Sequence, residues 1–574
     1  MLNLVYHFLL PVAMMPLFSS FCFLLFSLSS TSATGDDTVV VTNSGPVKGK
    51  LLPGGSSSVM AYLGIPYAEP PLGNLRFQKP HPHQPWSQVL EATNFGNACP
   101  QFTYPDFPDS DTWAPNRPLS EDCLFLNIWV PQPRPSTPPP ILVWIHGGSG
   151  FFTGTASLDL YNGASLAATE NVIVASMNYR LGALGFLSLP PAIPGNMGLW
   201  DQQLALTWIK DNAAAFGGNP NRVTLFGHNS GAVSVGLHLL SPKSQPLFSQ
   251  AVLQSGASNV LWAWKSPEEV KQKTLAFSQL LGCVEGDENA VLSCLKEKNV
   301  TEYGQHELSM IGKSEFLLDL PFLPTTDEDF LPDEPQKLLQ AGRFQVKPTL
   351  LGVTSDEASA FVLYYYPDTS HGLISWEQLL EAARKTIRKA TAEDVRAVAL
   401  KYSEEGRGAA QYRWAMSQMI GDYGFFCPLV EFAAKSQEAG SPVYAYVFSH
   451  HTSGSVFPEW IGAPHGAELP YVFGTLESAV GVNKTYTEAE AALSHRIMQY
   501  WAEFARSGNP TKSGAKEIKW PLYNATQQNF FLLSTKTSQT MQVSPARHCD
   551  FLKPNKSEEG FLSPGEDGKE SHSP

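Results

Sequence analysis

The feature that most constrains the fold of this chain is a series of short, uninterrupted runs of apolar residues. The clearest runs span residues 141–145, 172–175, 223–226, 251–253, 349–353 and 443–448. Apolar runs without polar alternation are typical of strands that are buried on both faces of a parallel sheet. Helical segments separate the runs, and the clearest one is 200–215, with apolar residues at Leu204, Trp208 and Ile209. We therefore expect an α/β protein with a large, mainly parallel central sheet and helices on both faces.

A late helix is marked at both of its ends. Thr487 and Glu490 form a capping-box pattern, and Gly508 follows the last apolar position. In such a box two side chains satisfy backbone N–H groups at the start of a helix, whereas glycine readily takes the left-handed conformation that ends one. The apolar positions between the caps share one face: Leu493, Ile497, Trp501 and Phe504. The pattern predicts a helix that packs this face against the core.

The two ends of the chain differ from its middle. Residues 1–33 read as a secretory signal peptide, with an apolar run over 8–28 and a small-residue cleavage site that ends at Ala33. No Lys or Arg precedes the apolar run, so an uncleaved anchor is the alternative interpretation. Residues 553–574 are polar and rich in Ser, Gly, Glu and Lys, which predicts a disordered tail.

The chain of 574 residues is acidic, because 39 Lys and Arg stand against 53 Asp and Glu, for a net charge of −14. No block of basic residues occurs along it. Such a chain is a poor partner for a phosphate backbone, and its field attracts cationic small molecules. We expect no nucleic-acid partner and no cofactor.

The cysteines indicate an oxidising compartment. Cys22 lies in the predicted signal peptide, which leaves six others: Cys99, Cys123, Cys283, Cys294, Cys427 and Cys549. Six cysteines allow many pairings, and the residues alone do not choose among them. None forms a Cys-x-x-Cys pair, so neither a zinc site nor a redox site is indicated. N-glycosylation acceptors occur at Asn299, Asn483, Asn524 and Asn555. These features predict a secreted glycoprotein with disulfide bonds and no metal site.

The sharpest local pattern lies at 223–232, where a strand, a tight turn and a helix follow one another. Gly227 and Gly231 have the spacing of a nucleophile elbow, Gly-x-Ser-x-Gly. The central position holds Asn229, and the hydroxyl of Ser230 comes one position late. The frame therefore predicts a catalytic turn whose central residue lacks the hydroxyl that the chemistry needs.

Longer motifs carry a resemblance to a known family. They read LGIPYAEPP at 63–71, SEDCLFLN at 120–127, GLHLLSP at 236–242, GVTSDE at 352–357 and PEWIGAPHG at 458–466. In these motifs the chain resembles the cholinesterase branch of the type-B carboxylesterases, most of all the butyrylcholinesterase type. The resemblance implies an α/β-hydrolase fold in a single domain, 34–552. It also implies the disulfide pairs Cys99–Cys123, Cys283–Cys294 and Cys427–Cys549.

By the same resemblance the catalytic acid is Glu357, the base is His465, and Asn229 takes the position of the nucleophile. The chemistry needs a carboxylate that orients an imidazole, and an imidazole that takes the proton of the nucleophile. The carboxamide of Asn229 has no proton that an imidazole can usefully remove, and it cannot form an acyl-enzyme. We therefore expect no normal esterase turnover.

Three interpretations of Asn229 remain. In the first, asparagine tolerates the positive φ of an elbow and keeps the turn, while the chemistry is lost. In the second, the nucleophile is Ser230, or residue 229 is Ser in other variants, and the protein is an active choline-ester hydrolase of the serine esterase type. In the third, Asn229 deamidates to Asp, which serves as a nucleophile elsewhere in this fold.

Two further departures from the family bear on catalysis. The oxyanion hole implied by the resemblance consists of Gly148, Ser149, Gly150 and Ser230, and its loop has one residue more than the loop of the family. Donors must lie about 2.7–3.1 Å from the developing charge, so the insertion is expected to disturb the hole. In addition, His228 replaces the Glu of the family beside the nucleophile and removes attraction for a quaternary ammonium.

The resemblance also implies an aromatic gorge for a ligand. Trp113 matches the tryptophan that holds an ammonium group by cation–π attraction. The residues that match the acyl pocket are Trp262, Leu318, Leu320, Phe361 and Phe425, and Ala360 and Tyr364 line the gorge. Leucine at two of these positions predicts a wide pocket. The expected partner is a small choline-ester-like or hydrophobic cationic ligand, and the expected assembly is a monomer or a noncovalent homodimer.

The sequence therefore predicts a secreted, cholinesterase-like α/β-hydrolase that lacks normal esterase turnover and binds a ligand or a protein partner. An active carboxylic-ester hydrolase is the first alternative. An extracellular structural or adhesion module is the second. In each case we expect no membrane span after removal of the signal peptide.

Overall fold

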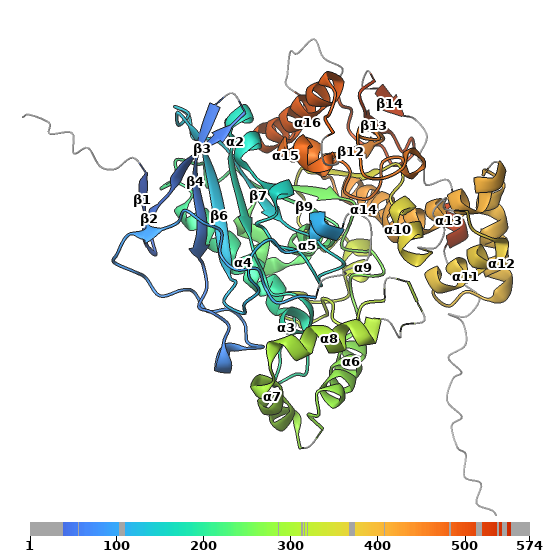
Figure 1. Cartoon of the computed structure of the whole chain (residues 1–574), viewed down its shortest axis with the longest axis horizontal. Helices are drawn as coiled ribbons and strands as arrows, with labels where there is room; N and C mark the ends of the chain where they lie inside the picture. The colour runs from blue at the N-terminus through green and yellow to red at the C-terminus, as the bar shows by residue number, and fades with distance from the viewer. Residues whose placement is uncertain are drawn as a thin grey trace, which may run out of the picture. The chain divides into compact units, whose positions relative to one another are not determined.

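The centre of the protein is one large mixed sheet, seen here in a computed structural model of the chain (Figure 1). Within the described residues it has eleven strands. Their spatial order is β14 (Gln539–Met541), β13 (Phe530–Leu533), β12 (Val443–Phe448), β11 (Thr349–Thr354), β10 (Gln250–Gln254), β9 (Val223–His228), β7 (Ile141–Ile145), β8 (Ile173–Met177), β6 (Phe125–Gln132), β4 (Ser57–Pro66) and β3 (Lys50–Gly54).

The structure does not describe every residue of the chain. The described residues are 38–55, 57–102, 110–284, 286–311, 314, 316–317, 319–366, 373–406, 408–480, 484–511, 519–536, 539–541 and 548–552. The predicted signal peptide and tail lie outside them, as do Leu318, Asn483 and Asn555. The side chain of Tyr364 also lies outside what is described.

Strand direction confirms the predicted architecture. The strands from β13 through β12, β11, β10, β9 and β7 to β8 pair in parallel, and the remaining strand pairs of this large sheet are antiparallel. The strands β7 to β12 are buried along their whole length. The apolar runs at 141–145 and 443–448 match β7 and β12 to the residue, and the other four lie within two residues of their strands.

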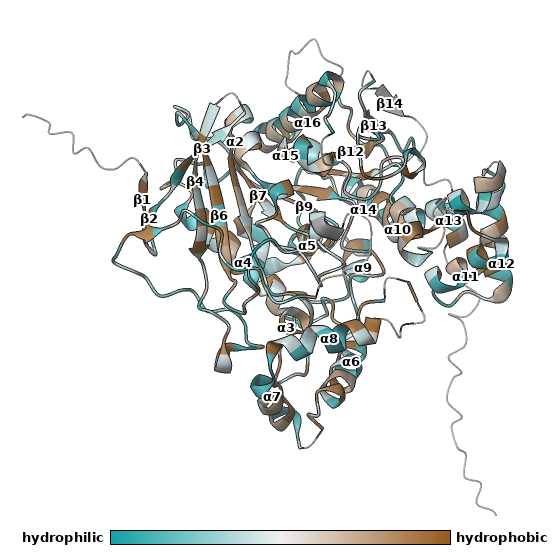
Figure 2. Ribbon diagram, in the orientation of Figure 1, coloured by the Kyte–Doolittle hydropathy of each residue, from teal (hydrophilic) through white to brown (hydrophobic). Residues whose placement is uncertain are grey.

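Helices cover both faces of this sheet. Those used below are α2 (Ala164–Glu170), α3 (Gly182–Phe186), α4 (Met197–Asn212), α5 (Ser230–Leu240), α8 (Val300–Ile311), α10 (Ser359–Tyr365), α11 (Trp376–Thr386), α12 (Ala392–Ser403), α13 (Gln411–Gly421), α14 (Cys427–Glu438), α15 (Leu469–Phe473) and α16 (Glu488–Ser507). Val143 and Leu225 face a core that α4, α5 and α14 cover, whereas the adjoining Leu142 and Phe226 face a second core beneath α2, α15 and α16. Successive side chains of a strand point to opposite faces, so the sheet is enclosed by two helical layers. Figure 2 shows apolar residues along the strands and frequent hydrophilic residues on α11 and α12.

The predicted caps of the late helix are present. Glu490 accepts a hydrogen bond from the Thr487 backbone N–H at 2.7 Å, the Thr487 hydroxyl accepts from the Glu490 N–H at 3.3 Å, and Gly508 has φ 76°. The earlier helix begins and ends three residues before its predicted bounds, at Met197–Asn212. Asn196 precedes it with φ 56° and bonds the backbone of a distant loop, a contact that local periodicity does not reveal.

Disulfides tie distant parts of the chain together. The pairs Cys99–Cys123, Cys283–Cys294 and Cys427–Cys549 are all formed, as the family resemblance implied. Of the glycosylation acceptors in the described chain, Asn299 is exposed and Asn524 is partly exposed. Across the described stretches, no helix combines the length and the apolar character that a bilayer span requires.

Candidate active site

The turn between β9 and α5 is a sharp elbow. Asn229 alone joins the two elements, with φ 57° and ψ −123°. The packing around it is tight: a Cβ atom on Gly231 would lie 2.0 Å from the carbonyl oxygen of Ile145, and one on Gly227 would lie 2.5 Å from the Gly231 backbone. Because no side chain fits at either glycine, the spacing Gly-x-Asn-x-Gly is required by the close approach of the backbones.

The backbone conformation of Asn229 agrees with the expected φ but not with the left-handed turn that asparagine prefers. Its φ is positive, as expected, but its ψ of −123° lies far from the value of about +47° at which asparagine is favoured. The conformation is therefore strained for asparagine as for other residues with a Cβ atom. Backbone hydrogen bonds hold it: the Asn229 N–H donates to Gln254 and its carbonyl accepts from Val233, each at 3.0 Å.

A continuous series of hydrogen bonds runs from Asn229 to a buried carboxylate. The amide Nδ2 of Asn229 lies 2.9 Å from Nε2 of His465, and Nδ1 of His465 lies 2.5 Å from Oε2 of Glu357. The other oxygen of Glu357 accepts from the Ser255 hydroxyl at 2.6 Å and from the Thr354 N–H at 2.8 Å. Because the carboxylate accepts at Nδ1, that nitrogen carries the imidazole proton, and Nε2 accepts from the amide.

The three residues of this series come from different parallel strands. Asn229 follows β9, Glu357 follows β11, and His465 lies beyond β12. The carboxyl ends of parallel strands meet at one edge of a sheet, which brings together residues as far apart in sequence as Asn229 and His465. In the described part of the chain, no three His, Cys, Asp or Glu side chains converge as a metal site. The reactive groups of the site are therefore an amide, an imidazole and a carboxylate.

The loop after β7 has a strained backbone. Four successive residues have positive φ: Gly148 at 150°, Ser149 at 40°, Gly150 at 59° and Phe151 at 77°. Such a value is an outlier for a bulky residue like Phe151. The Gly150 N–H donates to Oδ1 of Asn229 over 3.4 Å, which is a long hydrogen bond. The Asn229 side chain thus bridges the loop and the imidazole.

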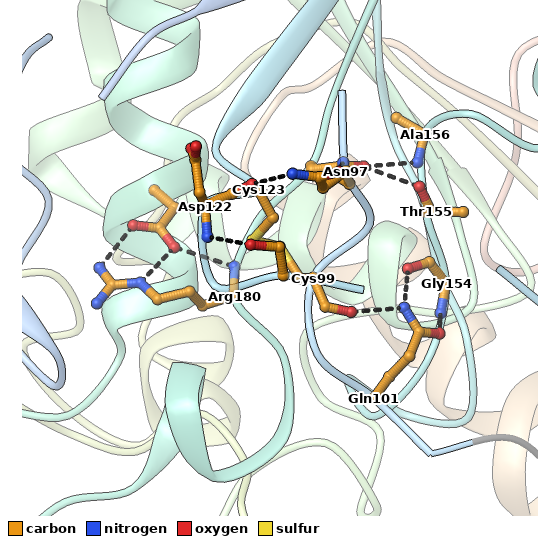
Figure 3. The surroundings of a disulfide bond; sticks show 12 residues. Asn97, Cys99, Gln101, Asp122, Cys123, Gly154, Thr155, Ala156 and Arg180 are labelled. Carbon is orange, nitrogen blue, oxygen red and sulfur yellow. Dashed lines mark hydrogen bonds and ion pairs between the residues drawn. A yellow bond between two sulfur atoms is a disulfide. The ribbon is translucent and has the colours of Figure 1, made fainter. Parts of the chain in front are cut away.

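Contacts from other parts of the chain hold this loop in place. The Gln101 side chain donates to the carbonyl of Gly154 at 2.9 Å and accepts from its N–H at 2.8 Å. Figure 3 shows Gln101 facing Gly154 beside the Cys99–Cys123 disulfide. At the other side, the Gly182 N–H donates to the carbonyl of Phe151 at 2.9 Å. The disulfide region and the start of α3 therefore fix both flanks of the loop.

A buried carboxyl supports the loop through α3. Glu307, on α8, accepts a hydrogen bond from the Ala183 N–H at 2.6 Å, directly after Gly182. Burial raises the pKa of Glu307 to about 8, because a charged carboxylate is poorly solvated there. At neutral pH the group is therefore mostly protonated.

The Ser230 hydroxyl is not hydrogen-bonded to the imidazole. Ser230 is fully buried at the start of α5, and its hydroxyl lies beside that of Tyr179, which donates to the carbonyl of His146 at 2.6 Å. Among the described residues, the Ser230 hydroxyl makes no hydrogen bond to His465. This geometry gives no support to Ser230 as a shifted nucleophile.

His228 and Trp113 lie on one side of the His465 imidazole. The His228 ring is 2% exposed, stacks on Trp113 with centroids 6.4 Å apart, and lies 4.3 Å from the His465 ring. Burial and the nearby His465 lower the pKa of His228 well below its ordinary value, so the ring is neutral. Its Nε2 has no hydrogen-bond partner among the described residues. This side of the site therefore has the aromatic face of Trp113 and the neutral imidazole of His228, with no carboxylate at position 228.

An aromatic wall stands on the other side of the imidazole. Phe425 lies 4.7 Å from His465, and Phe361 stacks on Phe425 at 6.1 Å. Trp262 lies 5.8 Å from Phe425, and its indole N–H donates to a backbone carbonyl of the same turn. That turn, Asp422–Phe426, is π-helical, and it joins α13 to α14. The structure thus brings three of the predicted pocket residues together.

The rest of the predicted pocket is placed as follows. Leu320 contacts the loop after β7, since a Cβ atom built on Gly150 would lie 2.2 Å from Cδ1 of Leu320. Ala360 is buried in α10, next to Phe361. Leu318 and the Tyr364 side chain lie outside the described residues, so their predicted roles stay predictions.

Several residues of the site were not predicted from the sequence. They are Gln101, Ser255 and Gln254. The Gln254 side chain donates to Glu468 at 3.1 Å and accepts from Trp501 at 3.1 Å. Burial and the charge of nearby Glu357 raise the pKa of Glu468 to about 7. Gln254 ends β10 and Ser255 follows it, and this position at the carboxyl end of a parallel strand is the one signal that could have revealed them.

Taken together, an elbow after one parallel strand, an acid after a later strand and an imidazole after the next define an α/β-hydrolase. The chain belongs to the carboxylesterase family, whose profile matches residues 36–552. It is similar to the acetylcholinesterase of Bungarus fasciatus, with 44% identity over 522 residues, which are 89% of this chain and 85% of that protein. It is also similar to the cholinesterase of Mus musculus, with 42% identity over 530 residues, which are 91% of this chain and 87% of that protein. The predicted fold and family are confirmed.

Proposed function

We propose that this protein is a secreted, cholinesterase-like member of the carboxylesterase family that binds its ligand without turning over esters. Asn229 takes the position of the catalytic nucleophile in this proposal. The observation that carries it is the contact of 2.9 Å between Asn229 and the imidazole of His465, which Glu357 orients from behind at 2.5 Å. The acid and the base are arranged for catalysis, but the group that faces them is an amide.

The chemistry of that amide accounts for the loss of turnover. A serine esterase needs a nucleophile that gives its proton to the imidazole and forms an acyl bond. In Asn229 the facing atom is an amide nitrogen, whose lone pair is delocalised into the carbonyl, so neither step proceeds. In a serine protease, loss of the nucleophile lowers kcat by about 10⁶. We expect a deficit of similar order here, because the Ser230 hydroxyl makes no hydrogen bond to the imidazole that could activate it.

The pocket supports a small, hydrophobic, cationic or choline-ester-like ligand. Trp113 offers a π face beside His228, and Phe361 and Phe425 provide an apolar wall beside His465. The net charge of −14 attracts cations. Because His228 is neutral, the attraction rests on aromatic faces, each worth about 0.5–2 kcal/mol. We therefore expect weaker binding of a quaternary ammonium than a carboxylate at position 228 would give.

Secretion is part of the proposal. The signal peptide predicted at 1–33 and the three disulfides support it, since disulfides persist in oxidising compartments. Of the two acceptors in the described chain, the exposed Asn299 is better placed for a glycan than the partly exposed Asn524. The expected assembly is a monomer or a noncovalent homodimer.

The test combines an ester assay with a covalent probe on the full-length secreted protein. We expect no hydrolysis of butyrylthiocholine or acetylthiocholine above background, and no labelling by a fluorophosphonate. Stoichiometric labelling at Ser230 would overturn the proposal and favour the active esterase. Binding is tested by titrating tetramethylammonium and following tryptophan fluorescence, with Trp113→Ala as the matched control. A signal that does not change in the parent protein would favour an extracellular structural module instead.

A further inference from the structure

The carboxamide of Asn229 is held as a hydrolase holds an amide substrate. Its Nδ2 lies 2.9 Å from Nε2 of His465, and its Oδ1 accepts from the Gly150 N–H at 3.4 Å. Asn229 is only partly buried, so solvent contacts it. Amide hydrolysis requires an imidazole near the leaving nitrogen, a donor at the carbonyl oxygen and a nucleophile from solvent. This turn provides the imidazole and the donor, and the partial exposure of Asn229 gives water access to it.

We propose that Asn229 is a self-modification site, at which the imidazole and carboxylate of the chain itself catalyse hydrolysis of the side-chain amide to aspartate. The proposal rests on the part of the proposed function that places Asn229 against His465. It requires no ester turnover, because the substrate is the elbow residue of the same chain.

The step balances with water as the only co-reactant. Nε2 of His465 takes a proton from water while the water oxygen forms a bond to Cγ of Asn229. The Gly150 N–H stabilises the oxyanion that forms at Oδ1, and Glu357 stabilises the imidazolium. Nε2 then returns the proton to Nδ2, the Cγ–Nδ2 bond breaks with its electron pair on nitrogen, and ammonia leaves. A final proton transfer to ammonia gives the side-chain carboxylate and ammonium.

The geometry favours this route over the usual deamidation of flexible chains. There the backbone nitrogen of the next residue attacks Cγ, and the cyclic imide that forms opens to a mixture of aspartate and isoaspartate. Ring closure needs the backbone to rotate at residues 229 and 230. Here a Cβ atom on Gly256 would lie 2.5 Å from the Asn229 carbonyl oxygen, and Ser230 is fully buried at the start of α5. A turn packed this tightly resists that rotation, so the expected product is aspartate without isoaspartate.

The product would change the charge of the site. An aspartate at position 229 would face Nε2 of His465, while Glu357 already faces Nδ1. The imidazole would then lie between two carboxylates, where the unmodified site has one carboxylate and one amide.

The experiment follows residue 229 by peptide mass spectrometry in the full-length secreted protein, incubated in water enriched in the heavy oxygen isotope. We expect conversion to aspartate with one heavy oxygen and without isoaspartate. The exposed Asn221 is the matched control in the same digest, and we expect it to give both products. His465→Gln should slow the conversion at position 229 by about 10²-fold or more and leave the rate at Asn221 unchanged.

A second variant, Glu357→Gln, keeps the shape of the acid and should also slow the conversion, with circular dichroism to verify folding of both variants. The proposal is wrong if position 229 keeps its amide while Asn221 deamidates, if isoaspartate accompanies the aspartate, or if both variants react at the parent rate. Labelling of Ser230 by a fluorophosphonate would overturn the proposed function without changing the mass-spectrometric result at position 229. Failure of the proposed function and failure of the self-modification proposal are therefore distinguishable.

Discussion

The two halves of the site are held in different ways. On the imidazole side, Glu357 accepts hydrogen bonds of 2.5, 2.6 and 2.8 Å from His465, Ser255 and Thr354. On the loop side, four successive residues have positive φ, and the Gly150 donor reaches Asn229 only at 3.4 Å. One half is built from short contacts, whereas the other carries backbone strain. The presence of the proposed acid and base therefore does not by itself imply a working oxyanion hole.

The largest expected effect comes from placing a hydroxyl at residue 229, which tests whether the loop side of the site can support catalysis. We expect Asn229→Ser to raise kcat/KM for butyrylthiocholine by at least about 10³-fold, because the acid and the base are already in place. Deletion of Ser149 in the same variant should add about 10²–10³-fold if the inserted residue misplaces the donors. Asn229→Ala, which removes the amide without adding a hydroxyl, is the control. No gain in either serine variant would mean that the deficit does not originate at residue 229.

The contrast between the halves also predicts two sizes of stability loss. Glu357→Ala leaves a partly buried imidazole and two donors without their acceptor, and we expect it to lower the free energy of unfolding by about 3–5 kcal/mol. Gln101→Ala removes two hydrogen bonds to Gly154 and should cost about 1–3 kcal/mol. Guanidinium denaturation measures both, with the exposed Gln245→Ala as a control within about 0.5 kcal/mol of the parent. A larger loss for Gln101→Ala would reverse the comparison.

The most gradual expected effect is a dependence of stability on pH. Near the acid, Glu468 has a pKa of about 7, and near the loop Glu307 has a pKa of about 8, both raised from 4.5 by burial. The folded protein therefore binds more protons than the unfolded chain between pH 4.5 and about 7 or 8. Stability falls as pH rises through that window, by at most about 1.4 kcal/mol per pH unit for each group.

Glutamine variants separate the two carboxyls. Glu468→Gln should flatten the fall in stability up to about pH 7, and Glu307→Gln should flatten it up to about pH 8. The measurement is the difference in unfolding free energy between parent and variant at several pH values and constant salt. Parallel curves for parent and variants would show that neither carboxyl retains its proton in the folded state.

Much of this fold could be predicted from local patterns. The buried strands are visible as apolar runs because both of their faces are covered, and Thr487, Glu490 and Gly508 mark the ends of α16 because capping is a local interaction. The acid, the base and the disulfide pairs came from the resemblance to a family. Single residues or spacings would not have chosen them.

The rest depends on contacts between distant segments. The ψ of Asn229 is set by packing of the elbow against Ile145 on another strand, so the preference of asparagine for a left-handed turn did not predict it. Ser230 lies beside Tyr179, and Gly154 is held by hydrogen bonds to Gln101. None of these contacts leaves a periodic or spaced pattern in the sequence.

The π-helical turn at Asp422–Phe426 has a consequence for how such a pocket can change. A π turn has about one residue more than an α-helical turn, and each residue of a helix advances the side-chain direction by roughly 100°. Loss of a single residue there would rephase the helix and swing Phe425 off the wall, while the central sheet stayed as it is. The aromatic wall can therefore be rearranged by small insertions or deletions in one helix, independently of changes at the elbow.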